Sequence, residues 1–95
     1  MIKRATSGSC VKVSFVLPVE VVDQPVSVVG DFNGWDPLAH PLKKRSNGTR
    51  SVSVELEPGC TYRFKYLIDD GSWLTEPDVD TVDNGHGGVD SIIAV

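Results

Sequence analysis

The sequence has little of what zinc sites, polyanion-binding surfaces and membrane segments depend on. It contains two cysteines and two histidines, none at zinc-binding spacing. Nine basic residues face thirteen acidic ones, and the net charge of -4 disfavours nucleic acid as a partner. No apolar run approaches the length of a membrane span, and the basic start at residues 1–4 is not followed by the apolar segment of a signal peptide. We therefore expect a soluble, cytoplasmic chain with no cofactor and no nucleic-acid or membrane partner.

Helical patterns are also scarce, whereas short alternating runs rich in Val, Ile and aromatic residues recur along the chain. Such runs, separated by turn residues, predict strands at 10–17, 26–30, 51–56, 62–68, 72–75 and 89–95. Residues 1–9 are polar and are expected to be a disordered N-terminal segment, followed by a single domain over residues 10–95. The size and spacing predict an all-β, immunoglobulin-like β-sandwich of about seven strands.

The long region between the second and third of these strands is rich in Gly, Asn, Asp and Pro and is expected to be a loop. Leu38 and Leu42 are expected to be buried and so to hold part of this loop against the domain. Each cysteine begins a strand, so we expect Cys10 and Cys60 to be half-buried thiols, with a single disulfide as the alternative. Residues 76–88 are acidic and glycine-rich and are expected to form a further loop.

Two tryptophans lie in turn-rich, polar segments rather than in apolar runs. Trp35 ends the segment Gly-Asp-Phe-Asn-Gly-Trp, and Trp73 follows Asp-Asp-Gly-Ser. Turns run over the surface, and a large exposed aromatic side chain there is typical of a binding surface. Lys65 is predicted on the polar face of strand 62–68, opposite Phe64 and Tyr66. Aromatic platforms beside a long cationic side chain suit a sugar, whose C–H faces stack on rings while its hydroxyls form hydrogen bonds. The alternative is that Trp35 closes one end of the sandwich and Lys65 only faces solvent.

Four segments together resemble the family 48 carbohydrate-binding modules, found in AMP-activated protein kinase β subunits and at the N-termini of isoamylases and branching enzymes. They are residues 28–36, residues 62–73, Glu-Pro-Asp at 76–78 and residues 87–95. The resemblance implies non-catalytic binding of α-1,4-linked glucan, with a glucan-active enzyme as a further partner. It places the two sugar-stacking tryptophans at Trp35 and Trp73 and the strand lysine at Lys65. Asp90 stands where the family has asparagine, and His86 where the kinase β subunits carry an apolar residue.

Catalytic and metal-binding interpretations have less support from the residues. The carboxylate pairs at 31 and 36 and at 69 and 70 lie in turns, where Asp is favoured for local backbone hydrogen bonds, and no nucleophile motif is present. The carboxylates at 78, 80 and 83 lack the spacing of a calcium loop. We expect a binding domain that is not an enzyme. The alternative is a structural or protein-interaction domain that packs against a glucan-active enzyme or kinase without binding sugar.

Overall fold

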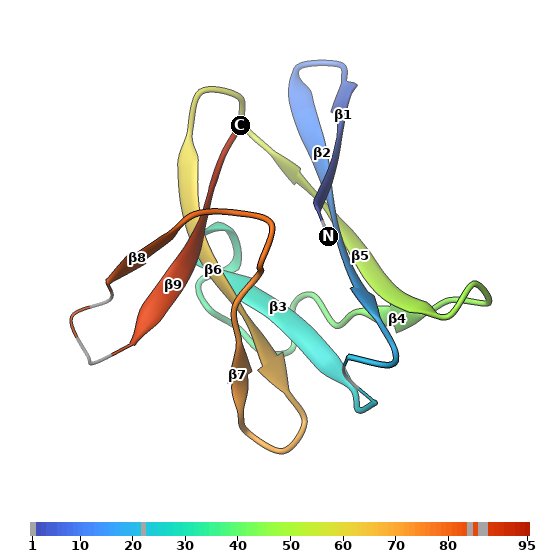
Figure 1. Ribbon diagram of the computed structural model, residues 1–95. Coiled ribbons are helices and arrows are strands. Elements are labelled where there is room, and N and C mark those ends of the chain that lie inside the picture. Colours follow the sequence, from blue (N-terminus) through green and yellow to red (C-terminus); the bar gives the residue numbers. More distant parts are fainter. Residues whose placement is uncertain (1, 22, 84, 86–87) are drawn as a thin grey trace.

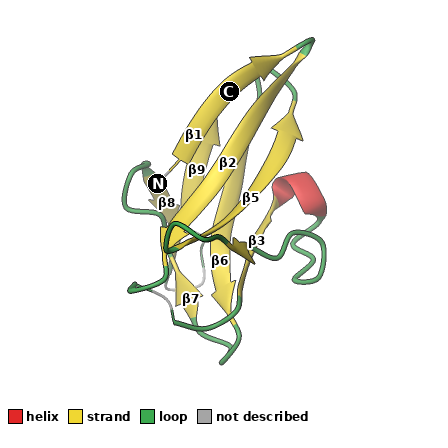
Figure 2. Cartoon of the chain, turned by 90° about the vertical axis from the view of Figure 1, so that its right-hand side faces the viewer, coloured by secondary structure: helices red, strands yellow, loops and turns green. Residues whose placement is uncertain are grey.

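The computed structural model describes residues 2–21, 23–83, 85 and 88–95, which form two antiparallel sheets packed face to face (Figure 1, Figure 2). The first sheet has the order β1-β2-β5-β4, with bounds Ile2–Ser7, Cys10–Pro18, Thr49–Leu56 and Lys43–Lys44. The second has the order β3-β6-β9-β8, with bounds Val26–Gly30, Thr61–Ile68, Val89–Ala94 and Thr81–Asp83. β7 (Trp73–Leu74) pairs with β6, and the short 3-10 helix η1 (Asp31–Asn33) follows β3.

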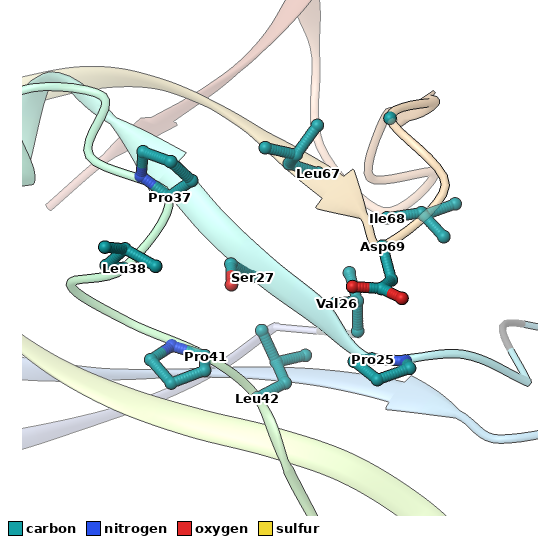
Figure 3. A pocket seen from close by; sticks show the side chains of 11 residues that line it. Pro25, Val26, Ser27, Pro37, Leu38, Pro41, Leu42, Leu67, Ile68 and Asp69 are labelled. Carbon is teal, nitrogen blue, oxygen red and sulfur yellow. The ribbon is translucent and has the colours of Figure 1, made fainter.

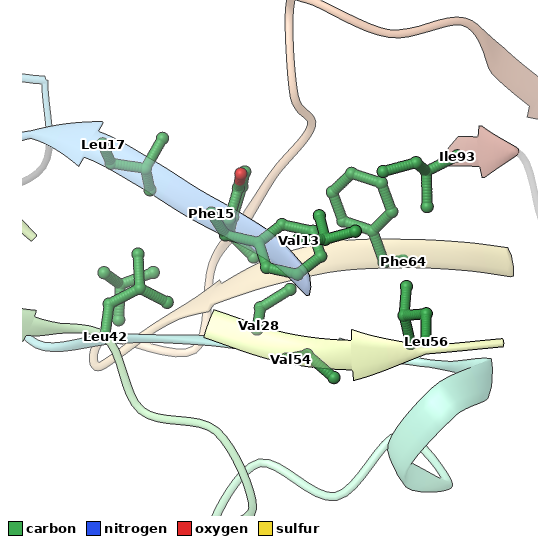
Figure 4. Close-up of a cluster of buried hydrophobic side chains, with 11 residues drawn as sticks. Val13, Phe15, Leu17, Val28, Leu42, Val54, Leu56, Phe64 and Ile93 are labelled. Atoms are coloured by element: carbon green, nitrogen blue, oxygen red, sulfur yellow. The ribbon is translucent and has the colours of Figure 1, made fainter. Parts of the chain in front are cut away.

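The core lies between the sheets and is built by the alternation of the strands (Figure 4). Phe15 of β2 meets Phe64 of β6 edge to face, with ring centroids 5.0 Å apart, and meets Tyr66 at 6.4 Å. Phe64 and Tyr66 are completely buried, and Lys65 between them points to the other side of the sheet. The predicted separation of the two faces of this strand is therefore confirmed, and with it the all-β sandwich.

Gly30 allows β3 to pair closely with β6. Its backbone is extended, with φ -176°, so the conformation does not require glycine. A Cβ at this position, however, would collide with the carbonyl oxygen of Arg63 and lie 2.8 Å from Cβ of Phe64. The glycine is therefore required by contact with the neighbouring strand, at the point where the loop of Trp35 begins.

The structure differs from the sequence-based expectation in several edge segments. Ile2–Ser7 forms β1 and pairs with β2 along its whole length, whereas residues 1–9 were expected to be a disordered segment. β4 and β8 are two- and three-residue edge strands within the expected loops. Leu42 is buried as predicted, but the expectation for Leu38 was wrong, because its side chain is 85% exposed. Leu42 follows a segment that bonds to β3, whereas Leu38 lies in a turn closed by the carboxylate of Asp36.

Both cysteines are free and half-buried, which confirms the thiol interpretation over the disulfide. Pro58 and Gly59 form the predicted turn before β6, with Gly59 at φ 84°. The described part of the chain contains no helix long and apolar enough to cross a membrane.

Candidate functional site

The outer face of the second sheet brings Lys65, Asp90 and Trp73 together. Lys65 lies near the middle of β6, and the register that pairs Phe64 with Ser91 sets Asp90 of β9 beside it. The Lys65 ammonium is 3.6 Å from Oδ1 of Asp90, and the two side chains are 14% and 10% exposed. The same ammonium lies 5.6 Å from the centre of the Trp73 ring, within cation–π range. One cation is therefore shared by a carboxylate and an aromatic face.

Trp73 is presented to solvent by the hairpin that joins β6 to β7. Its cross-strand partner is Leu67, so it belongs to the same outer face as Lys65. The turn is closed by Asp70, whose Oδ1 accepts a hydrogen bond from the backbone N–H of Ser72, and Gly71 adopts φ 88°. The hydrogen bonds from the Ser72 hydroxyl and backbone lower the pKa of Asp70. The indole itself is 54% exposed, which leaves a broad apolar face open to a ligand.

Trp35 is held by its contacts with β3 and η1. Its φ of 59° is the only positive value at a non-glycine position among the described residues, and it follows Gly34 at φ 66°. Its backbone N–H donates to the carbonyl of Gly30 at 3.0 Å, and its indole Nε1–H donates to Oδ1 of Asp31 at 3.1 Å. Oδ2 of Asp31 accepts from the backbone N–H of Arg63 on β6 at 2.9 Å. Asp31 therefore ties the half-buried Trp35 to the strand that carries Lys65.

Asn33 and His40 organise the rest of this loop. Asn33 Oδ1 accepts from the backbone N–H of Gly30 at 3.1 Å, and its Nδ2 donates to the carbonyl of Val28, also at 3.1 Å. The same Nδ2 lies 2.9 Å from Nδ1 of His40. The sequence analysis missed both residues, because an Asn and a His seven positions apart in a loop carry no recognisable pattern.

The buried carboxylate of Glu76 links residues that lie next to the candidate site. Glu76 is only 1% exposed, and its Oε1 accepts from the hydroxyl of Tyr66 at 2.7 Å. Its other oxygen accepts from the backbone N–H of Asp78, and its own N–H donates to the hydroxyl of Ser91. Burial and the nearby carboxylate raise the pKa of Tyr66 far above its usual value. Glu76 thus connects the segment after Trp73 to the residue beside Asp90, although the sequence showed only an acid in an acidic loop.

The remaining predicted residues divide into three groups. His86 lies outside the described residues. Three of the carboxylates considered for catalysis form hydrogen bonds within the protein. Asp31 accepts from Trp35 and from the N–H of Arg63, Asp36 from the N–H of Leu38, and Asp70 from the N–H of Ser72. Within the described ranges, no group of three or more His, Cys, Asp or Glu side chains is placed to hold a metal ion.

An apolar groove of about 310 Å³ borders the site on the side of β3 (Figure 3). Its wall includes Leu67, the cross-strand partner of Trp73, and Ser27 of β3. Pro37, Leu38 and Pro41 of the Trp35 loop form the opposite wall. The outer face therefore continues from the aromatic platform into a shallow hydrophobic depression.

Sequence comparison relates the chain to known proteins. Residues 21–95 match the family described as the glycogen recognition site of AMP-activated protein kinase. A 1,4-alpha-glucan branching enzyme, GlgB 2, of Xanthomonas campestris pv. campestris (strain 8004) is 43% identical over 56 residues, which are 58% of this chain and 8% of the enzyme. The corresponding enzymes of Cupriavidus pinatubonensis and Methylococcus capsulatus are 43% and 45% identical over 47 and 42 residues. These cover 44% and 42% of this chain and 6% of each enzyme.

The chain thus spans less than a tenth of the length of these relatives. The family match, in contrast, covers all of the second sheet, including the positions of Trp35, Lys65, Trp73 and Asp90. The match identifies the domain as a carbohydrate-binding module and not as a catalytic domain. This chain belongs to the family of the glycogen recognition site of AMP-activated protein kinase.

Proposed function

We propose that this domain binds α-1,4-linked glucan of the glycogen and starch type through the outer face of its second sheet, without cleaving it. The observation that carries the proposal is the position of the Lys65 ammonium, 5.6 Å from the exposed Trp73 ring and 3.6 Å from the Asp90 carboxylate. A glucose ring has weakly apolar C–H faces and a polar rim. A broad aromatic face can stack on the C–H faces, and the cation and the carboxylate beside it can form hydrogen bonds with the polar rim.

In this proposal Trp73 and Trp35 stack on sugar rings, while Lys65 donates to hydroxyls and Asp90 accepts from them. The lysine and aspartate pair is largely buried, so its hydrogen bonds to a ligand are stronger than those of freely solvated side chains. His86 is proposed as a further contact at the rim. A cytoplasmic location and association with a glucan-active enzyme belong to the same proposal and are consistent with the branching-enzyme relatives.

Affinity electrophoresis in gels with and without glycogen tests the proposal. The wild-type chain is expected to be retarded by glycogen, and Trp35→Ala and Trp73→Ala are expected to migrate faster, because each removes a stacking surface. Loss of a central aromatic contact costs about 2 kcal/mol or more, or about thirtyfold in affinity. Val21→Ala is the control, since it removes an exposed apolar side chain from another part of the chain. A double tryptophan variant that is retarded like the wild type would refute the assignment.

A second candidate function is a contact with a protein partner. It is favoured by Leu38, which is 85% exposed at the wall of the apolar groove. Side chains of this kind are unusual on a free surface when they line a groove, and they are common where domains pack together. A wild-type chain that glycogen does not retard would favour this second function.

A further inference from the structure

We propose that His40 is a positioning residue of the glucan site, whose neutral imidazole holds the Trp35 loop through Asn33, so that protonation of His40 weakens glucan binding. The inference rests on the proposed function and deepens it. The side chain of Asn33 has an orientation that the backbone fixes.

The amide of Asn33 can be oriented in only one way. The backbone N–H of Gly30 can only donate, and it faces Oδ1 at 3.1 Å. The carbonyl of Val28 can only accept, and it faces Nδ2 at 3.1 Å. A flipped amide would set oxygen against oxygen and N–H against N–H. Nδ2 is therefore the atom that lies 2.9 Å from the imidazole of His40.

This orientation fixes the tautomer of His40. Because the amide nitrogen is only a donor, Nδ1 of the ring must accept, and the ring proton must be on Nε2. A protonated imidazole carries hydrogen on both nitrogens and has no acceptor left. Protonation therefore replaces a hydrogen bond with two donors that face each other.

The ring is not free to turn away from this contact. The carbonyl of His40 accepts from the backbone N–H of Val28 at 3.1 Å, which fixes the main chain beside β3. The ring packs edge to face on Phe32, with centroids 6.0 Å apart, and Phe32 stacks on Phe15 of the core at 5.7 Å. Turning the imidazole away would disturb this row of rings.

The charged groups on the elements around His40 are engaged elsewhere or exposed. β3 carries no charged side chain, and Asp31 of η1 bonds Trp35 and the N–H of Arg63. Asp36 bonds the N–H of Leu38, and the two lysines of β4 are exposed. Among the described residues, Asn33 is the one polar side chain with a hydrogen bond to the imidazole.

The contact matters for binding because the same few groups hold Trp35. Gly30, which Asn33 fixes through its N–H, accepts the backbone N–H of Trp35 through its carbonyl. Trp35 needs this support, since its φ of 59° is unfavourable for a residue with a side chain. If the loop is loosened, ligand binding must also order the indole of Trp35, and this lowers the affinity. Loss of one hydrogen bond of average strength corresponds to about a fivefold to tenfold weaker affinity.

Calorimetric titration of the 95-residue chain with maltoheptaose at pH 7.5 and 5.5, at constant ionic strength, tests the inference. Histidine is the side chain whose ordinary charge change falls in this range. The wild type is expected to bind more weakly at pH 5.5, with about fivefold to tenfold as the limit set by loss of the hydrogen bond. In His40→Asn the new amide oxygen can take the place of Nδ1 at both pH values, so its affinity is expected to change less than twofold.

A wild type without pH dependence, or a His40→Asn variant that keeps it, would overturn the inference. An NMR titration without sugar gives a second measurement, with the indole resonance of Trp35 assigned by comparison with Trp35→Phe. The resonance is expected to shift with pH in the wild type and not in His40→Asn. If the chain binds no maltoheptaose at pH 7.5, the proposed function fails. The NMR titration still decides the coupling, because an indole resonance that does not shift with pH overturns it, and one that shifts in the wild type but not in His40→Asn supports it.

Discussion

Removing the hydroxyl of Tyr66 tests whether the buried Glu76 supports the site. The ring of Tyr66 is completely buried, and its hydroxyl donates to Oε1 of Glu76 at 2.7 Å. Tyr66→Phe deletes one oxygen atom and keeps the ring, so the packing of the core changes little. The carboxylate of Glu76 loses a donor in a place where water does not replace it, because the residue is 1% exposed.

The expected cost follows from this geometry. A hydrogen bond to a charged group contributes about 1.5–3 kcal/mol, and the loss of a donor to a buried carboxylate belongs in the upper part of that range. We expect Tyr66→Phe to lower the free energy of unfolding by about 2–3 kcal/mol. For a domain of this size, about 1 kcal/mol shifts the melting temperature by about 4–8 °C, so the midpoint is expected to fall by at least about 8 °C.

Urea unfolding and thermal melting measure the effect, with Tyr62→Phe as the matched control. Tyr62 lies four residues earlier on the same strand and is only half-buried, so its hydroxyl is expected to contribute less than about 0.5 kcal/mol. If Tyr66→Phe is as stable as the wild type to within about 0.5 kcal/mol, the proposed role of the Glu76 contact is wrong.

Alkaline pH provides an independent readout of the same contact. Burial, followed by the nearby Glu76 carboxylate, raises the pKa of Tyr66 in the folded chain. In the unfolded chain a tyrosine ionises near pH ~10. The contribution to stability is therefore complete below pH ~10 and is lost as the pH rises above it, by up to about 1.4 kcal/mol per pH unit. Tyr66→Phe is expected to lack this part of the alkaline decline, which unfolding experiments between about pH 8 and 11 can measure.

Two further substitutions test the close strand contact and the ion pair. Gly30→Ala is expected to cost at least about 2 kcal/mol, because its Cβ would collide with the carbonyl of Arg63, whereas Gly8→Ala, in open space at φ 61°, is expected to cost about 1 kcal/mol of backbone strain. Equal losses in urea unfolding would contradict this difference. Asp90→Asn is expected to cost about 1–2 kcal/mol, because it leaves the half-buried Lys65 ammonium beside a neutral amide. The free energy of unfolding of Asp90→Asn is also expected to depend less on salt than that of the wild type. An unchanged salt dependence would count against the ion pair.

The alternation within single strands was enough to predict the sandwich and its faces. Strand 62–68 shows this clearly, since its aromatic residues enter the core and Lys65 faces outward as the period of two requires. Short edge strands were missed because they lack enough residues to show a period. β1 is held by its pairing with β2, which a polar sequence does not reveal.

The site could be predicted only in part from the sequence. The turn-borne tryptophans and the outward lysine indicated a binding face, and the structure places Lys65 between Trp73 and Asp90. The supporting residues were not visible, because Asn33 acts through backbone groups of its own loop and Glu76 through neighbours farther away in the chain. Such contacts depend on the register of the strands and the course of the loop, which composition and spacing do not specify.

The affinity of the wild type and of Trp73→Ala for maltoheptaose, measured by calorimetric titration at pH 7.5, tests the central claim most directly. A β-linked oligomer, cellohexaose, serves as the comparison ligand. The account predicts that the wild type binds the α-linked oligomer in preference and that Trp73→Ala binds it about thirtyfold more weakly or not at all, with an unchanged melting temperature. A wild type that binds neither sugar, or a Trp73→Ala variant with wild-type affinity, would contradict the account.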